Sequence, residues 1–335
     1  MPQPTTPSWS ASLLRRDLSA RANDLARTQE LLHDLSPGPE PAIIFGRDEH
    51  GRHGNFHAAS YQKICANPVW LRRLTKPHTA SRRSRARKDW QWMELDSSNS
   101  SDALLMNIFC HPKVFDGTVL TRAVANLLNV DPNAQPCFGI NPGVPLKKLR
   151  KGRNKLPSEL TDRTEIDLQL HNLFLEAKLT ESNFQTAAPS LVERYRDLET
   201  IFDIIRLPRK IVHSPATHPL AEDFSQLEEP SPSASPPNPG PSRTLIQGYQ
   251  LIRNVLAAYA ADASFCVLCD ARRRDLIEIW YSILSAVHRP TFAARLKLVT
   301  WQELSATLPK DLQHFLETKY GIVQTSGQSL PIFRW

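Results

Sequence analysis

The feature that most constrains this chain is a short segment, residues 164–178, in which polar and apolar residues alternate on both sides of His171-Asn172. Alternation with a period of two is typical of β-strands that bury one face. Asn172 suits a tight turn because asparagine tolerates a positive φ. We therefore predict an antiparallel hairpin of two strands, Thr164–Leu170 and Leu173–Lys178.

The register of this hairpin places charged side chains on one face. Asp167 lies opposite Glu176, and Glu165 lies opposite Lys178. The other face is apolar and carries Ile166, Leu168, Leu175 and Ala177.

Two carboxylates that face each other repel, whereas a divalent cation turns the repulsion into coordination, and oxygen ligands suit Mg²⁺. Lys178 would then lie beside the metal, where it can hold a water nucleophile or stabilise negative charge on a phosphate. A solvated hairpin with a Glu165–Lys178 ion pair would show the same pattern, so the spacing alone leaves both interpretations open.

Asp167 followed by Glu176-Ala-Lys178 resembles the PD-(D/E)xK nuclease superfamily, and most of residues 50–322 is similar to a branch of uncharacterised bacterial proteins described as restriction endonucleases. The resemblance implies an α/β, restriction-endonuclease-like core of a mixed β-sheet flanked by helices. It also implies Asp167 and Glu176 as ligands of Mg²⁺, with Mn²⁺ as a substitute, and Lys178 as the catalytic lysine. The segments that carry the similarity are 92–109, 164–167, 176–181, 249–254 and 300–322.

The chain departs from the superfamily pattern because Ile166, and not proline, precedes Asp167. Many members also carry an acidic residue on the helix before the sheet. Glu94 and Asp102 precede the predicted strands, and either of these, or Glu165, would complete the metal site.

The rest of the pattern predicts one α/β domain over residues 39–322, between an N-terminal helical extension at 1–38 and a tail at 323–335. The helix at 9–36 reads as an appendage or a partner-docking helix, and the Pro/Ser-rich stretch near 227–243 as a flexible insertion. Further strands are predicted at 42–45, 264–270 and 296–300, and further helices at 58–75, 100–109, 118–129, 189–206, 243–262, 273–289 and 309–319.

Positive charge is concentrated in two short runs. Eight Lys or Arg and no acid lie between Arg72 and Lys88, and six more lie between Lys147 and Lys155, in a chain whose net charge is +7. Such runs favour a polyanion partner such as DNA, although a solvated basic loop gives the same pattern. Trp70, Trp90 and Trp92 flank the first run and offer surfaces for base stacking.

Several other functions lack support in the sequence. No apolar run approaches the roughly 20 residues of a membrane span, and five scattered cysteines fit a reducing cytoplasm. We interpret Cys266 and Cys269 as packing thiols in an apolar strand. A zinc site at Glu49, His50, His53 and His57 is disfavoured because the segment is a polar turn with no second ligand pair.

No glycine-rich phosphate, dinucleotide or methyl-donor loop is present. A protective DNA methyltransferase would therefore be a separate protein, and the resemblance leads us to expect a homodimer. The first hypothesis is a Mg²⁺-dependent restriction-like DNA endonuclease. The alternative is a catalytically inactive nucleic-acid-binding module on a nuclease-like fold in a defence or repair assembly. In a third interpretation the partner is RNA, or a protein docked by helix 9–36.

Overall fold

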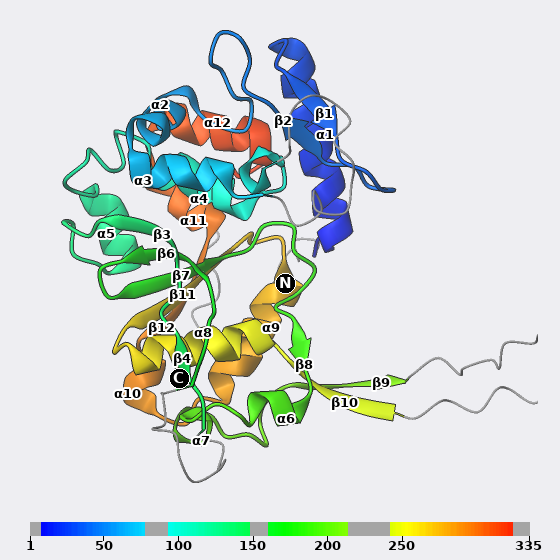
Figure 1. Ribbon diagram of the computed structural model, residues 1–335, viewed down its shortest axis with the longest axis vertical. Coiled ribbons are helices and arrows are strands. Elements are labelled where there is room, and N and C mark those ends of the chain that lie inside the picture. The colour runs from blue at the N-terminus through cyan, green and yellow to red at the C-terminus, as the bar shows by residue number, and fades with distance from the viewer. Residues whose placement is uncertain (1–7, 78–92, 148–159, 214–241, 324–335) are drawn as a thin grey trace, which may run out of the picture.

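The centre of the computed structural model, which describes residues 8–77, 93–147, 160–213 and 242–323, is a five-stranded mixed sheet (Figure 1). Three neighbouring strands run parallel, and the two strands at the other edge are antiparallel. This confirms the predicted α/β class. The order across the sheet is β12 (Leu296–Thr300), β11 (Ser264–Cys269), β7 (Leu173–Ala177), β6 (Ile166–Leu170) and β3 (Pro136–Ile140).

Burial along the strands follows their place in the sheet. β6 alternates between buried and half-buried residues, as the sequence pattern predicts for a strand with one covered face. β7 lies between β6 and β11 and is buried throughout. Its two flanking strands and the helices above and below exclude water from both of its faces.

Helices cover both faces of the sheet (Figure 1). Leu168 and Leu175 belong to one apolar core, and Phe174 and Val267 belong to a second core across the sheet. The first core is covered by α2 (Ala58–Ala66), α4 (Ser101–Phe109), α5 (Arg122–Leu128), α11 (Trp301–Ala306) and α12 (Lys310–Tyr320), and the second by α8 (Tyr249–Ala260), α9 (Arg274–Ser285) and α10 (Pro290–Ala293).

The N-terminal helix α1 (Ala11–Thr28) packs on this body. Ser10 caps it by accepting a hydrogen bond from the backbone N–H of Leu13. Leu14 and Leu18 are buried in the same core as α4 and α12. Arg272 lies over the ring of Trp9 at 4.7 Å, and these contacts attach the helix to the sheet domain.

The other elements are short and join the main layers. They are the helices α3 (Pro68–Leu71), η1 (Arg72–Thr75), η2 (Glu94–Asp96), α6 (Pro189–Val192) and α7 (Leu198–Ile201), and the strand groups β1 (His33–Leu35) with β2 (Ile43–Phe45), β4 (Val144–Pro145) with β5 (Thr161–Asp162), and β8 (Thr186–Ala187) with β10 (Ser242–Gln247) and β9 (Arg209–His213).

Four predicted helices differ from the observed elements. The helix predicted at 58–75 is three short elements, α2, α3 and η1. The helix predicted at 243–262 starts only at Tyr249, because the β-branched residues before it form β10 and Gly248 turns the chain with φ +71°. The helix predicted at 189–206 is two short helices, α6 and α7, and the one predicted at 9–36 ends at Thr28 before β1.

Parts of the sequence interpretation lie outside the described residues. These are most of both basic runs, at 78–88 and 148–155, together with Trp90 and Trp92, the Pro/Ser-rich stretch up to residue 241, and the tail from residue 324. In the described ranges, no helix combines the length and the apolar character needed to span a bilayer.

Candidate active site

The hairpin that carries the predicted catalytic residues has the predicted register. Leu168 pairs with Leu175, and Leu170 pairs with Leu173. The expectation for the turn was wrong in one respect, since His171, and not Asn172, adopts the positive φ, at +52°. The register nevertheless brings the two strands together as the alternation predicts.

The backbone pairing of β6 with β7 ends at Leu168. Before this residue, the side chain of Asp167 takes the place of a backbone hydrogen-bond acceptor. The Oδ2 atom of Asp167 accepts a hydrogen bond from the backbone N–H of Ala177 at 2.8 Å. This bond holds the Asp167 carboxylate against β7, while its residue stays partly exposed. The predicted pairing of Glu165 with Lys178 is wrong, because Lys178 instead contacts Glu176 on its own strand.

Both carboxylate oxygens of Glu176 are fixed by donors. Oε1 accepts from the ammonium of Lys178 at 2.7 Å and from Nε2 of Gln250 at 2.6 Å, and Oε2 accepts from Nδ2 of Asn254 at 2.7 Å. Glu176 is only 1% exposed. Helix α8 therefore reaches the site through Gln250 and Asn254. Arg253 does not take part and lies over the Tyr249 ring at 5.2 Å.

Lys178 is buried at the end of β7, where its backbone is anchored on both sides. Its N–H donates to the carbonyl oxygen of Leu268 at 2.8 Å, and its carbonyl oxygen accepts from the indole N–H of Trp301 at 2.9 Å. Burial acts to lower the pKa of the ammonium, but Glu176 and Glu181 outweigh it and raise the pKa above the ordinary value of 10.5. Lys178 therefore stays charged.

The two predicted metal ligands, Asp167 and Glu176, both have pKa values above those of ordinary carboxyl groups. Burial, followed by the nearby charges of Glu176 and Asp102, raises the pKa of Asp167 well above its ordinary value. Burial also raises the pKa of Glu176, although Lys178 partly offsets this effect. The single ammonium of Lys178 does not compensate for two carboxylates held in a site of low dielectric.

A second group of acids surrounds this centre and is paired with two cations. Arg73 donates to Oε1 of Glu165 at 2.9 Å and to Asp102. Lys76 lies 2.9 Å from Glu165 and 2.9 Å from Glu94. Burial acts to raise the pKa of Glu165, but Lys76 and Arg73 lower it below its ordinary value. Burial raises the pKa of Asp102 to about 6, against the influence of Arg73.

The sequence interpretation missed these two cations as parts of the site. Arg73 and Lys76 belong to the basic run from Arg72 to Lys88, for which the sequence predicts DNA binding. It also missed Glu181, which accepts from the hydroxyl of Ser101 at 2.8 Å and from the backbone N–H of Leu179 at 2.7 Å. Only the spatial meeting of η1, α4 and β7 reveals their roles.

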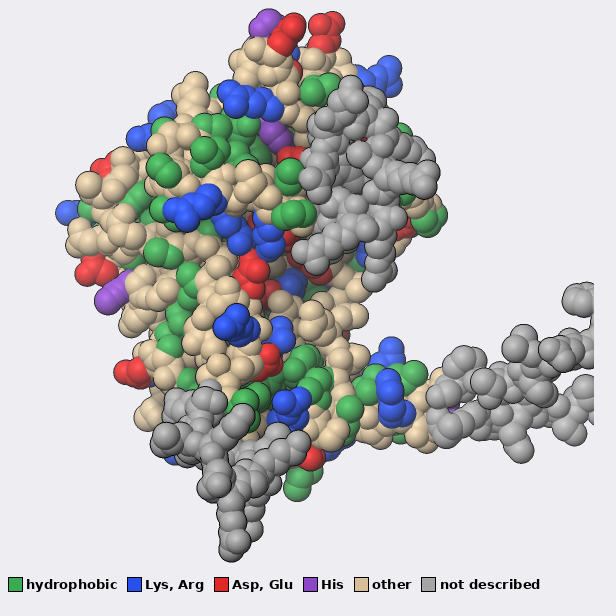
Figure 2. Space-filling view, viewed as in Figure 1, with side chains coloured by type: hydrophobic (Ala, Val, Ile, Leu, Met, Phe, Trp, Pro, Cys, Tyr) green, Lys and Arg blue, Asp and Glu red, His purple; other side chains and the backbone are tan. Residues whose placement is uncertain are grey.

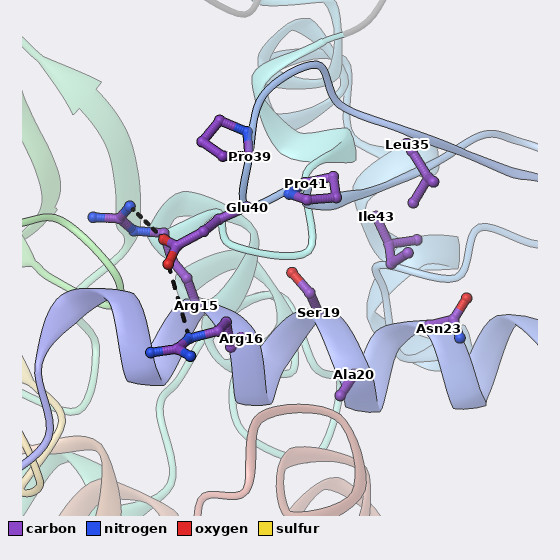
Figure 3. A pocket seen from close by; sticks show the side chains of 10 residues that line it. All are labelled: Arg15, Arg16, Ser19, Ala20, Asn23, Leu35, Pro39, Glu40, Pro41 and Ile43. Atoms are coloured by element: carbon purple, nitrogen blue, oxygen red, sulfur yellow. Dashed lines mark hydrogen bonds and ion pairs between the residues drawn. The ribbon is translucent and has the colours of Figure 1, made fainter.

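Acidic side chains gather near the middle of the face shown in Figure 2, with Lys and Arg side chains next to them. A separate pocket of about 300 Å³ lies between α1 and residues 35–43 (Figure 3). Its carboxylate, Glu40, is paired with Arg15 at 3.4 Å and with Arg16 at 3.8 Å. Since this acid is already neutralised by two arginines, the group around Asp167 is the better candidate for catalysis.

His53, Cys266 and Cys269, which the sequence interpretation did not assign to a metal site, all lie in the protein interior. His53 is buried and its Nε2 atom lies 3.1 Å from Asp96. Cys266 and Cys269 are both buried in β11, one in each core, and burial raises the pKa of Cys266 to about 12. A pair of thiols on opposite faces of a strand does not bind one metal ion.

The model of a family described as restriction endonuclease associating with ARP matches residues 30–321. The chain belongs to this family. The match contains the whole five-stranded sheet and all three predicted catalytic residues, and it confirms the resemblance to restriction endonucleases. No curated protein and no solved structure matches the chain.

Proposed function

We propose that this protein is a Mg²⁺-dependent DNA endonuclease that hydrolyses phosphodiester bonds, with Asp167 and Glu176 as metal ligands and Lys178 as the catalytic lysine. The observation that supports it most strongly is the geometry of the hairpin, which holds the carboxylates of Asp167 and Glu176 on β6 and β7 beside the buried ammonium of Lys178. A divalent cation would relieve this imbalance, and carboxylate oxygens are the ligands that Mg²⁺ prefers. The family description makes DNA the expected substrate.

The chain's own residues would each take a distinct part. The backbone N–H of Ala177 orients Asp167, and Gln250 and Asn254 orient Glu176. Lys178 would hold the attacking water or stabilise the charge that develops on the scissile phosphate. The bound Mg²⁺ would supply Lewis acidity and a water of lowered pKa.

We propose Asp102 as the acid that completes the metal site. The charge of Asp102 contributes to the raised pKa of Asp167, and its own pKa is raised to about 6. Glu165 differs because its pKa is lowered by Arg73 and Lys76. Asp102 also contacts Arg73 and lies 4.0 Å from Lys76, but these cations do not offset its burial, so a metal ion would relieve more uncompensated charge there than at Glu165.

A plasmid cleavage assay tests this function. The wild-type protein should nick or cut DNA in Mg²⁺ or Mn²⁺ and not in EDTA, and Lys178→Ala should abolish cutting while DNA binding stays within a fewfold. Lys310→Ala is the control, since it removes an exposed lysine at the start of α12 that donates to Gln313, and it should retain cutting. Cutting in EDTA, or full activity of Lys178→Ala, would refute the assignment.

One observation favours the second candidate, a nucleic-acid-binding module without turnover. Lys178, Gln250 and Asn254 already occupy both oxygens of Glu176, and Arg73 occupies Asp102. This candidate predicts salt-dependent DNA binding without cleavage under any divalent metal. A homodimer, a separate methyltransferase and the ARP of the family description are the partners we propose for either candidate.

A further inference from the structure

A histidine pair and an aspartate meet on the side of the molecule formed by α2, α4 and α12 (Figure 1). His57 caps the start of α2, His111 follows α4, and Asp311 lies in the first turn of α12. One potential ligand atom from each residue lies within 4.8 Å of the other two. Three elements that are distant in the sequence therefore place nitrogen and oxygen ligands around one point.

A second observation indicates that this cluster lacks a partner. His111 is 1% exposed, and its Nε2 atom is buried without a hydrogen-bond partner among the described residues. The same atom lies 4.0 Å from Oδ2 of Asp311, which is too far for a hydrogen bond. A buried polar atom left unpaired is costly, so a ligand that binds Nε2 would stabilise the fold.

The two rings face each other, with centroids 4.8 Å apart, and both are poor bases. Burial, followed by the charge of His57, lowers the pKa of His111 to about 4. Burial also lowers the pKa of His57, although Asp311 opposes the shift. Burial thus disfavours the charged form of both imidazoles, and the neutral form is the one in which histidine binds metals.

We propose that His57, His111 and Asp311 bind one Zn²⁺ ion, with water in the fourth position. Two imidazoles and one carboxylate form a donor set that suits zinc, whereas the carboxylates around Asp167 suit Mg²⁺. The ion would hold α12 against α2 and α4. This role is structural and does not depend on the proposed nuclease activity.

Binding has two identifiable costs. The Nδ1 atom of His57 now accepts from the backbone N–H of Ala59 at 3.3 Å, and Nδ1 of His111 accepts from that of Lys113 at 3.2 Å. A neutral ring that binds zinc through Nε2 carries its proton on Nδ1, so these long bonds are lost. Lys113, which lies 2.8 Å from Oδ2 of Asp311, must also move, but it is 65% exposed and free to turn into solvent.

The experiment is a Zn²⁺ titration of metal-free protein by calorimetry, with thermal unfolding as a second readout. The chain carries Asp167→Asn to weaken binding at the catalytic carboxylates. We expect one ion per chain and a Tm higher by at least about 3 °C at a hundredfold excess over Kd. No binding, or binding without a rise in Tm, would overturn the proposal.

Variants then assign the site. His57→Asn and His111→Asn can keep the backbone hydrogen bonds and should weaken Zn²⁺ binding at least about tenfold. His50→Asn, at an exposed histidine outside the cluster, should change nothing. Lys113→Ala should tighten binding about two- to fivefold, because it removes the competing cation without touching a ligand. Unchanged affinity in His111→Asn, or loss of binding in His50→Asn, would refute the assignment, and the Lys113 variant tests it even if a histidine variant unfolds.

Discussion

Two groups of carboxylates lie side by side near β6 and β7, and they differ in how their charge is balanced. Glu165 is paired with Arg73 and Lys76, and Glu94 is paired with Lys76, each at 2.9 Å, and the pKa of Glu165 is lowered. Lys178 forms an ion pair with Glu176 and acts on Asp167 through its charge, yet the pKa values of both carboxylates are raised. The first group is a completed ion-pair network, whereas the second is deficient in positive charge.

The difference shows which acids are suited to a metal ion. Like charges buried close together destabilise the fold unless a partner compensates for them. Uncompensated buried charge of this kind occurs at functional sites. Lys178, Gln250 and Asn254 hold Glu176 at both oxygens, so its position does not depend on a metal ion. The protein thus contributes a rigid acid, a partly exposed acid and an ammonium to the same point.

The largest expected effect is on DNA cleavage. Asp167→Asn should reduce the cleavage rate about a thousandfold or more, because it removes a metal-binding charge from the reaction centre. Glu165→Gln, two residues earlier on the same chain segment, should stay within about threefold. Initial rates on supercoiled plasmid in Mg²⁺ measure both. Equal losses in the two variants would erase the distinction between the groups.

A smaller effect is expected on stability. Asn254→Leu removes the donor to Glu176 and the acceptor of the Thr164 hydroxyl, which lies at 2.8 Å. Since buried partners are left unpaired, the free energy of unfolding should fall by about 1–3 kcal/mol. Gln250→Leu should cost less, because Gln250 is only partly buried and water can replace it. Urea denaturation in EDTA gives the comparison, and a larger loss for Gln250→Leu would contradict it.

The smallest effect is a pH dependence with a defined sign. The pKa of Asp167 in the folded chain lies above its ordinary value of 3.8, so its contribution to stability is present below that value and is lost as the pH rises through the raised pKa. In EDTA the Tm of the wild type should therefore fall relative to that of Asp167→Asn as the pH rises through the raised pKa of Asp167. A constant difference in Tm would show that Asp167 carries no raised pKa.

The sequence predicted the hairpin because two local signals agree. Alternation defined the strands, and the turn at His171-Asn172 set the register, which the pairing of Leu168 with Leu175 confirms. The strands β11 and β12 were predicted from short apolar runs at 264–270 and 296–300 and appear at Ser264–Cys269 and Leu296–Thr300. Such patterns are local, so no knowledge of the tertiary structure was needed.

The polar neighbours of the site were harder to predict because they depend on tertiary contacts. Nothing in the spacing of Arg73 and Lys76 indicates that these cations contact Glu165. The sequence therefore predicted a cross-strand pair of Glu165 with Lys178 instead. The strand β3, which completes the sheet, contains proline and glycine and gives no alternation. His57 and His111 illustrate the same limit, since only the packing of α2 against α4 brings them together.

Calorimetric titration of Mg²⁺ into DNA-free protein tests the central claim most directly. It measures the affinity of the carboxylates for the metal ion without requiring turnover. The wild type and Glu165→Gln should bind Mg²⁺ with similar affinity, and Asp167→Asn should lose at least about tenfold. Equal binding by the wild type and Asp167→Asn would contradict the assignment of Asp167 and Glu176 as the metal ligands.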